Sequence, residues 1–148
     1  MPDPPAWLAE HPSEEIDQGY VTTAEDATEV RVRRGERGSV LAVKRGSGLS
    51  RAETEIRLTG EQADALWPLT EGRRIRKRRH RVPVDGTTIE VDVYGDRLEG
   101  LSVGEVEFSS ERASEGFNPP PWLGRELTDD PRYRNERLAE HGAPEEPA

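Results

Sequence analysis

The sequence predicts an all-β-dominated α+β domain: an antiparallel sheet curled into a closed or nearly closed barrel, with a few outer helices. Three observations support this prediction. Apolar and charged residues alternate with a period of two in short runs, Asp85-Gly86 marks a tight hairpin turn, and helix signals are few. Many strands with few helices favour a sheet that closes on itself, because closure removes unpaired strand edges.

Six segments show the alternation expected of strands. The segments are residues 29–33, 40–44, 53–58, 75–84, 87–94 and 103–108, in which apolar and charged residues largely alternate, except that 40–44 is mostly apolar with Lys44 at its end. Charged residues two apart in such a segment therefore lie on the same face of the sheet.

Two helices and two irregular ends complete the predicted organisation. Thr59 and Gln62 have the spacing of a capping box, and Pro68 is expected to end that helix. Asp130 and Pro131 predict the N-cap and first turn of a helix through Ala139. The Pro-rich residues 1–15 are expected to form an irregular lead-in, residues 16–141 the barrel domain, and residues 142–148 a disordered tail.

The composition predicts a thin hydrophobic core. Only 32% of the 148 residues are hydrophobic, while 34% are charged. The apolar residues are clustered in alternating runs, which argues against disorder in the middle of the chain. The sequence has no cysteine, so it offers neither a disulfide framework nor a thiolate metal site. No apolar run approaches a membrane span and no leader pattern opens the chain, so a cytoplasmic location without membrane contact is expected.

The charge pattern argues against a nucleic-acid partner. The net charge is −9, and such a field repels phosphate backbones over long range. The basic run from Arg73 to Arg81 contains no aromatic residue on which bases could stack. One face of this strand is therefore expected to be solvated, and the other to point toward acidic side chains on other strands of the sheet.

Like charges recur in pairs at positions i and i+2. The pairs are Arg31 and Arg33, Lys77 and Arg79, Glu53 and Glu55, Glu90 and Asp92, and Glu105 and Glu107. Any one pair is more simply explained as a solvated sheet face on which neighbouring strands cancel charge. Five pairs in one small sheet favour an inward polar face instead, where basic rows hold phosphate oxygens and acidic rows hold a hard divalent cation.

Taken in chain order, these charged pairs resemble the pattern of the CYTH, or triphosphate tunnel metalloenzyme, family, and specifically its short bacterial inorganic triphosphatases. The similarity extends from Gln18 to Leu138. Further matching segments are Gln18-Gly19-Tyr20, Leu49-Ser50-Arg51, Leu66-Trp67-Pro68, Glu71-Gly72-Arg73-Arg74, and the C-terminal run 119–124 followed by Asp130, Arg132-Tyr133 and Asn135.

The resemblance implies an eight-stranded tunnel that hydrolyses a small-molecule triphosphate with Mg²⁺ or Mn²⁺. By position in the family pattern, phosphate binding falls to Arg31, Arg33, Lys44, Lys77 and Arg79. Metal binding falls to Asp92, Glu105 and Glu107. Lys77 and Arg79 are also the expected catalytic residues, together with Glu53 and Glu55, which would orient basic side chains or water.

One family feature has no match in this chain. The opening strand of the family carries Glu-x-Glu-x-Lys, so two metal-binding carboxylates, one lysine and one barrel wall are expected to be missing. The expected enzyme is a triphosphatase, an acid-anhydride phosphohydrolase, that binds triphosphate better than it hydrolyses it. A non-catalytic triphosphate- or nucleotide-binding module is the alternative. Nucleotide cyclases and thiamine triphosphatases share the fold, although the C-terminal run favours the inorganic triphosphatases.

Overall fold

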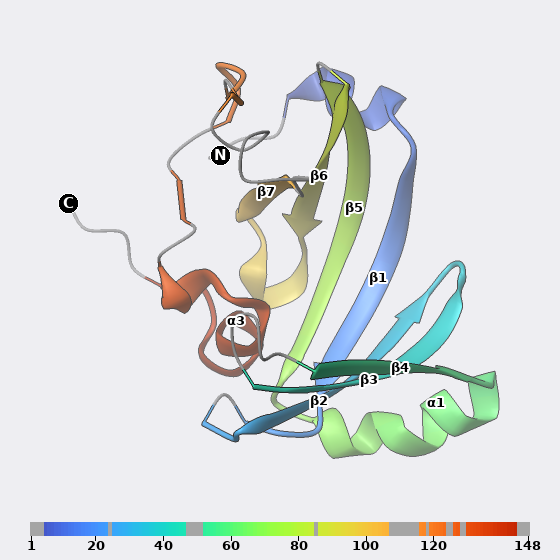
Figure 1. The fold of residues 1–148 in the computed structure, drawn as a ribbon. Coiled ribbons are helices and arrows are strands. Elements are labelled where there is room, and N and C mark those ends of the chain that lie inside the picture. Colours follow the sequence, from blue (N-terminus) through green and yellow to red (C-terminus); the bar gives the residue numbers. More distant parts are fainter. Residues whose placement is uncertain are drawn as a thin grey trace.

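Seven antiparallel strands form one sheet in the computed structural model, which describes residues 5–23, 25–46, 52–84, 86–106, 116–117, 119–123, 126–127 and 130–144. The order across the sheet is β4-β3-β2-β1-β5-β6-β7. The bounds are β1 (Ser13–Tyr20), β2 (Thr28–Gly35), β3 (Gly38–Arg45), β4 (Ala52–Leu58), β5 (Arg74–Val84), β6 (Thr87–Tyr94) and β7 (Ser102–Val106). The sheet is strongly curled, so that β2, β3 and β4 turn away from the long strands β1 and β5 (Figure 1).

The helices begin where the sequence places polar caps. In α1 (Gly60–Leu66), Thr59 Oγ1 accepts a hydrogen bond from the Gln62 amide at 3.1 Å, and Gln62 Oε1 accepts one from the Thr59 amide at 2.9 Å. This confirms the predicted capping box. Short 3-10 helices are η1 (Ala6–Glu10), η3 (Trp67–Thr70), η4 (Asp96–Leu98) and η5 (Pro131–Tyr133).

The C-terminal helix is shorter than predicted. The Asp130 side chain accepts a hydrogen bond from the Arg132 amide and caps η5, as its place before Pro131 indicated. Arg134 then adopts an extended backbone (φ −67°, ψ 143°), so the segment divides into η5 and α3 (Asn135–His141). None of the described helices has the length and apolar character needed to span a bilayer.

The two faces of the sheet are covered differently. On the convex face, η1 together with Phe117, Trp122 and Leu123 covers the apolar side chains of β5 and β6. The buried members of this core are Leu8, Val82, Ile89 and Val91. Gly104 allows the close packing, because a Cβ there would lie 2.7 Å from Leu123 Cδ2.

The concave face has its own small apolar cluster where α3 packs against it. The buried members are Tyr20, Ile75, Tyr94, Leu98, Tyr133, Leu138 and Ala139. Thus α1 lies outside β2, β3 and β4, as expected, whereas α3 lies within the curl (Figure 1). The prediction that the helices are all outer elements is wrong for α3, because its apolar face covers Tyr20 and Ile75 on the concave side.

Two other expectations differ from the structure. Among the described residues no hydrogen-bonded pairing joins β4 to β7, so closure of the barrel is not confirmed. The irregular lead-in expected for residues 1–15 contains η1 and the start of β1 at Ser13. This strand lacks an apolar alternation because Glu14 and Gln18 point to a charged face, opposite Arg79 and Arg33 respectively. Residues 145–148 of the expected tail lie outside the described residues.

Candidate functional site

The strand register gathers most of the predicted site residues on the concave face. Arg33 lies opposite Gln18 on β1, and Lys44 lies opposite Glu53 on β4. Residues that face each other across an antiparallel pair share a side of the sheet, as do residues two apart on one strand. By this rule the shared face holds Arg31, Arg33, Lys44, Glu53, Glu55, Lys77, Arg79, Asp92 and Glu105.

Asp92 on β6 connects two of the predicted cations. Its carboxylate accepts two hydrogen bonds from Arg79, one from Nε at 2.8 Å and one from Nη2 at 3.0 Å. Lys77 Nζ lies 3.0 Å from Asp92 Oδ2, and the Lys77 side chain is 0% exposed. One buried carboxylate therefore holds an ammonium and a guanidinium group side by side.

The pKa values of this cluster reflect burial and mutual charge. Burial lowers the pKa of Lys77, although the Asp92 charge opposes this. Burial alone would raise the pKa of Asp92, but hydrogen bonds from Arg79 and the charge of Lys77 outweigh it and lower that pKa. Asp92 therefore remains an anion at neutral pH and cannot serve as a proton donor there.

Arg33 is held by a neutral partner rather than by a carboxylate. Gln18 Oε1 accepts hydrogen bonds from Arg33 Nε at 3.3 Å and Nη2 at 3.2 Å. Gln18 is fully buried, and its Nε2 donates to the Tyr20 hydroxyl at 2.7 Å. Within the part of the chain that the structure describes, Arg33 forms no ion pair. Burial and the charges of Arg31 and Arg79 lower its pKa.

Gln18 is a functional candidate that sequence reasoning missed. Gln18 belongs to a segment that resembles the CYTH family, but the sequence predicted no role for its side chain. The one available signal was its place between Ile16 and Tyr20 on the face that also holds charged residues. From sequence alone, a buried glutamine that positions a functional side chain cannot be distinguished from one that hydrogen-bonds nearby backbone groups.

A second charged cluster lies toward the β4 edge of the sheet. Arg31 Nη2 and Lys44 Nζ both lie 3.7 Å from Glu53 Oε1, which is beyond hydrogen-bond distance. Glu55 is exposed and lies opposite Ala42. The structure thus brings Arg31, Lys44 and Glu53 together, whereas Glu55 contributes charge to the same face without an ion pair in the described residues.

The predicted metal ligands are only partly assembled. Glu105 on β7 is exposed and lies directly opposite Glu90, while both oxygens of Asp92 are engaged by Arg79 and Lys77. Glu107 lies outside the described residues. Among the residues that are described, no group of three or more His, Asp or Glu side chains is placed to hold a metal ion.

Two further carboxylates, not assigned roles from the sequence, extend the ion-pair network. Arg81 Nη2 lies 2.9 Å from Glu14 Oε1, and Arg79 Nη1 lies 3.4 Å from Glu90 Oε2. Glu14 fell in the expected lead-in next to Glu15, and because adjacent residues cannot share a strand face, the two were not expected to replace the missing Glu-x-Glu-x-Lys carboxylates. The position of Glu14 shows that β1 contributes side chains to the charged concave face.

The C-terminal segment closes one end of this face. Tyr94, two residues after Asp92, donates a hydrogen bond from its hydroxyl to Asn135 Oδ1 of α3 at 2.7 Å. Burial raises the pKa values of Tyr20 and Tyr94, so both phenols stay protonated. The result is a concave basic surface with an apolar end wall, suited to an anion with several negatively charged oxygens.

Comparison with known proteins gives consistent matches. An inorganic triphosphatase from Nitrosomonas europaea is 46% identical over 124 residues, covering 82% of both chains. An inorganic triphosphatase from Acetivibrio thermocellus is 40% identical over 126 residues, which is 84% of this chain and 79% of that protein. No family model matches the sequence.

Solved structures share the fold. The crystal structure of an inorganic triphosphatase superimposes with a TM-score of 0.73 and 39% sequence identity, covering 95% of this chain and 90% of that one. A protein from Pyrococcus horikoshii reaches a TM-score of 0.50 at 19% identity over 70% of this chain, which shows similarity of fold alone.

Proposed function

Since this chain belongs to the CYTH-type short inorganic triphosphatases, we propose that it hydrolyses inorganic triphosphate on the concave face of its sheet. The observation that carries the proposal is Arg33, a largely buried guanidinium with only a neutral partner in the described structure. A buried cation without a counter-ion is costly, and a phosphate oxygen would supply the missing charge. Lys77 and Arg79 lie on β5, which is separated from the strand of Arg33 by β1, and they extend the basic surface on the same face.

Hydrolysis requires a water oxygen to attack a terminal phosphorus while the bridging P–O bond breaks. Triphosphate and water then give phosphate and diphosphate, with the proton of water passing to solvent or product. Negative charge is spread over the phosphate oxygens during this step, so placed cations are the main requirement. Arg33, Lys77 and Arg79 would neutralise that charge, and Asp92 would hold Lys77 and Arg79 in position before substrate arrives.

We propose Mg²⁺ or Mn²⁺ as the cofactor. The carboxylate oxygens of Glu90, Asp92 and Glu105 are donors of the type that these ions prefer. Glu90 and Glu105 face each other directly, an arrangement of like charges that a bound cation would relieve. A bound divalent ion would polarise phosphate oxygens and activate water. Glu107 is expected to bind the same metal ion as Glu105. We also propose that the curled sheet closes into a tunnel and that the protein acts in the cytoplasm.

A second candidate function is triphosphate binding without catalysis. It is favoured by the engagement of both Asp92 oxygens by cations and by the small number of carboxylates that converge in the described residues. Neutralising phosphate oxygens needs only the basic rows, whereas hydrolysis also needs placed metal and water.

The deciding experiment measures phosphate release and binding in parallel. Triphosphate, ATP and thiamine triphosphate are each offered with Mg²⁺, with Mn²⁺ and with excess EDTA, and binding is followed by calorimetry. Metal-dependent release that is fastest with inorganic triphosphate is the expected result. Tight triphosphate binding with no release under any metal condition would replace the triphosphatase by the binding module, and fastest release from another substrate would change the substrate assignment.

A further inference from the structure

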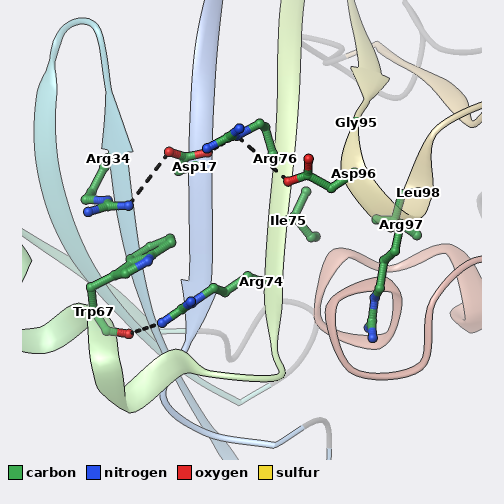
Figure 2. A pocket seen from close by; sticks show the side chains of 10 residues that line it. All are labelled: Asp17, Arg34, Trp67, Arg74, Ile75, Arg76, Gly95, Asp96, Arg97 and Leu98. Atoms are coloured by element: carbon green, nitrogen blue, oxygen red, sulfur yellow. Dashed lines mark hydrogen bonds and ion pairs between the residues drawn. The ribbon is translucent and has the colours of Figure 1, made fainter.

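A second basic cavity lies on the convex side of the sheet, away from the candidate active site. It has a volume of about 190 Å³, and it is lined by Asp17, Arg34, Trp67, Arg74, Ile75, Arg76, Gly95, Asp96, Arg97 and Leu98. Figure 2 shows these side chains arranged on both sides of β1 and β5. Arg33 and Arg34 are consecutive on β2, so their side chains point to opposite faces and belong to different sites.

A row across three strands forms the middle of this cavity. Arg34 on β2 and Arg76 on β5 both lie opposite Asp17 on β1. Arg76 Nε contacts Asp17 Oδ1 at 2.9 Å, whereas Arg34 Nη2 is 3.8 Å from Asp17 Oδ2. The single central carboxylate therefore satisfies Arg76 much better than Arg34.

Arg34 is held in place but not satisfied. Its guanidinium carbon lies 3.8 Å from the centre of the Trp67 ring, a stacking distance that restricts the side chain. Its remaining ion pair, Nη1 to Asp64 Oδ1, measures 3.5 Å. Nε is buried and has no hydrogen-bond partner in the described part of the chain. An oriented guanidinium with an unused buried donor indicates that an acceptor is missing from the cavity.

The other cations are fixed by protein groups and leave an excess of positive charge. Arg74 donates to Thr70 Oγ1 at 3.0 Å and to the Trp67 carbonyl oxygen at 2.9 Å. Arg97 donates to the carbonyl oxygens of Leu138 and Ala139 at the end of α3. Among the lining residues, four guanidinium groups exceed the two carboxylates of Asp17 and Asp96 by two charges. The exposed carboxylates of Asp64 and Glu15 lie outside this lining, 3.5 Å from Arg34 and 3.9 Å from Arg76.

The size and lining of the cavity restrict the class of ligand. Pockets for drug-sized ligands hold roughly 300–1,000 Å³, so this cavity is too small for a nucleotide. Arg34 already covers the Trp67 ring, which argues against stacking of a base or another aromatic group. A compact anion with several acceptor oxygens matches both the charge excess and the unused donor.

We propose that this outer cavity, centred on Arg34 and Trp67, is a second anion site that binds a phosphate-sized tetrahedral oxyanion. Binding there does not depend on the activity proposed for the concave face. If that activity is also correct, the outer site would be exposed to the phosphate that the enzyme releases.

Trp67 fluorescence provides a local readout of this site. The chain has three tryptophans, and Trp7 of η1 contacts Trp122, with ring centres 5.3 Å apart. A W7F/W122F protein therefore reports on Trp67 alone. Inorganic phosphate is titrated against this protein at constant ionic strength, with chloride and sulfate in separate arms. Saturable change with phosphate and sulfate, and none with chloride, is expected.

Arg33 and Arg34 supply matched variants on opposite faces. R34Q should weaken the Trp67 response to phosphate by about tenfold or more, because it removes a charged donor, whereas R33Q should leave that response unchanged. R34K keeps the charge and should retain more affinity than R34Q. Calorimetry on the protein with all three tryptophans repeats the comparison in case the double replacement harms folding.

Several outcomes would overturn the proposal. A response that chloride reproduces would show ionic strength alone, and equal phosphate affinity in R34Q and the parent would show that Arg34 binds nothing. Loss of the response in R33Q but not in R34Q would place the phosphate on the concave face. The parallel triphosphate assay of R34Q keeps the two sites distinguishable, because its triphosphate binding is expected to be normal.

Discussion

The two faces of β5 place neighbouring basic residues in very different surroundings. On the concave face, the Lys77 and Arg79 side chains are 0% and 12% exposed and share one buried carboxylate at hydrogen-bond distances. On the convex face, Arg76 and Arg78 are 52% and 43% exposed. Among the described carboxylates, those of Glu15 and Glu36 approach Arg78 to 3.7 Å and 3.9 Å. Four consecutive positions of one basic run thus alternate between a preorganised site and a largely solvated surface.

This difference shows that burial, rather than residue type, determines how strongly a charged side chain in this sheet contributes to stability and to ligand binding. Exposed ion pairs are worth about 0–1 kcal/mol, because water screens them and both side chains stay mobile. Removing one partner of a buried pair costs about 3–5 kcal/mol, because the other charge is left without a partner. The same dehydration makes the concave cations stronger ligands for phosphate oxygens.

The largest expected effect is on stability, from replacing the carboxylate that two buried cations share. Asp92→Asn should lower the free energy of unfolding by about 3–5 kcal/mol, because Lys77 and Arg79 lose their common anion. Asp17→Asn, the corresponding change beside Arg76 on the convex face, should cost less than about 1 kcal/mol. Urea unfolding of both variants measures the difference.

Triphosphate sharpens this test. Because the ligand would supply the missing negative charge, its addition should raise the unfolding midpoint of Asp92→Asn more than that of Asp17→Asn. Equal losses of stability in the two variants would mean that the two faces do not differ as described.

The next effect concerns phosphate recognition by alternating positions of β5. Arg79→Gln should lower kcat/KM for triphosphate by about 100- to 1,000-fold, since a placed cation acts on the developing charge. Arg78→Gln, one residue away on the convex face, should change it by less than about threefold. Similar losses at both positions would indicate a nonspecific basic patch, and phosphate-release kinetics decide between the two results.

The acidic edge of the concave face should affect metal dependence without affecting the fold. Glu105→Gln should reduce turnover at limiting Mg²⁺ by about 10- to 100-fold, an effect typical of a weakened metal site. Its unfolding free energy should stay the same or rise, because the repulsion between Glu90 and Glu105 is relieved. Glu15→Gln on the convex face is the control, and unchanged turnover of Glu105→Gln would remove Glu105 from the proposed metal site.

The smallest expected effect is a shift in pH dependence. Burial lowers the pKa of Lys77 below the ordinary value of 10.5, so its amine loses its proton at a lower pH than an exposed lysine. Triphosphate affinity measured without metal should therefore fall as pH rises through that lowered pKa. Lys77→Arg should abolish the fall, since arginine stays charged over the range from neutral pH to about pH 10.

The convex cavity offers the contrast for this measurement. Arg76 in this cavity donates a hydrogen bond to Asp17, which raises the pKa of Arg76. Phosphate binding in the convex cavity should therefore not change over the same alkaline range. An identical pH profile for both sites would show that Lys77 does not control the concave one. Calorimetric titrations at several pH values supply both profiles.

Much of the fold could be predicted because the signals are local. The alternation from Ile75 to Arg81 assigned each basic side chain to a face, and the Thr59 and Gln62 spacing located α1. Both follow from backbone geometry that needs no distant contact. The start of β1 at Ser13 could not be predicted in this way, because Glu14 and Gln18 interrupt the apolar residues Ile16 and Tyr20 on its concave face, and the regular apolar alternation that marks a strand is missing.

Sequence alone specifies which side chains share a face of each strand, since the two-residue period is a property of the extended backbone. It also carried the ordered charged pairs on which the resemblance to the short inorganic triphosphatases rests, and the comparisons find relatives with that name. The folded structure was needed to show that Asp92 holds both Lys77 and Arg79, that Gln18 positions Arg33, and that α3 packs inside the curl. It likewise placed Trp67 beneath Arg34, on the face opposite Arg33. These arrangements depend on strand register, sheet curvature and the burial of segments far apart in the chain, which local sequence patterns do not specify.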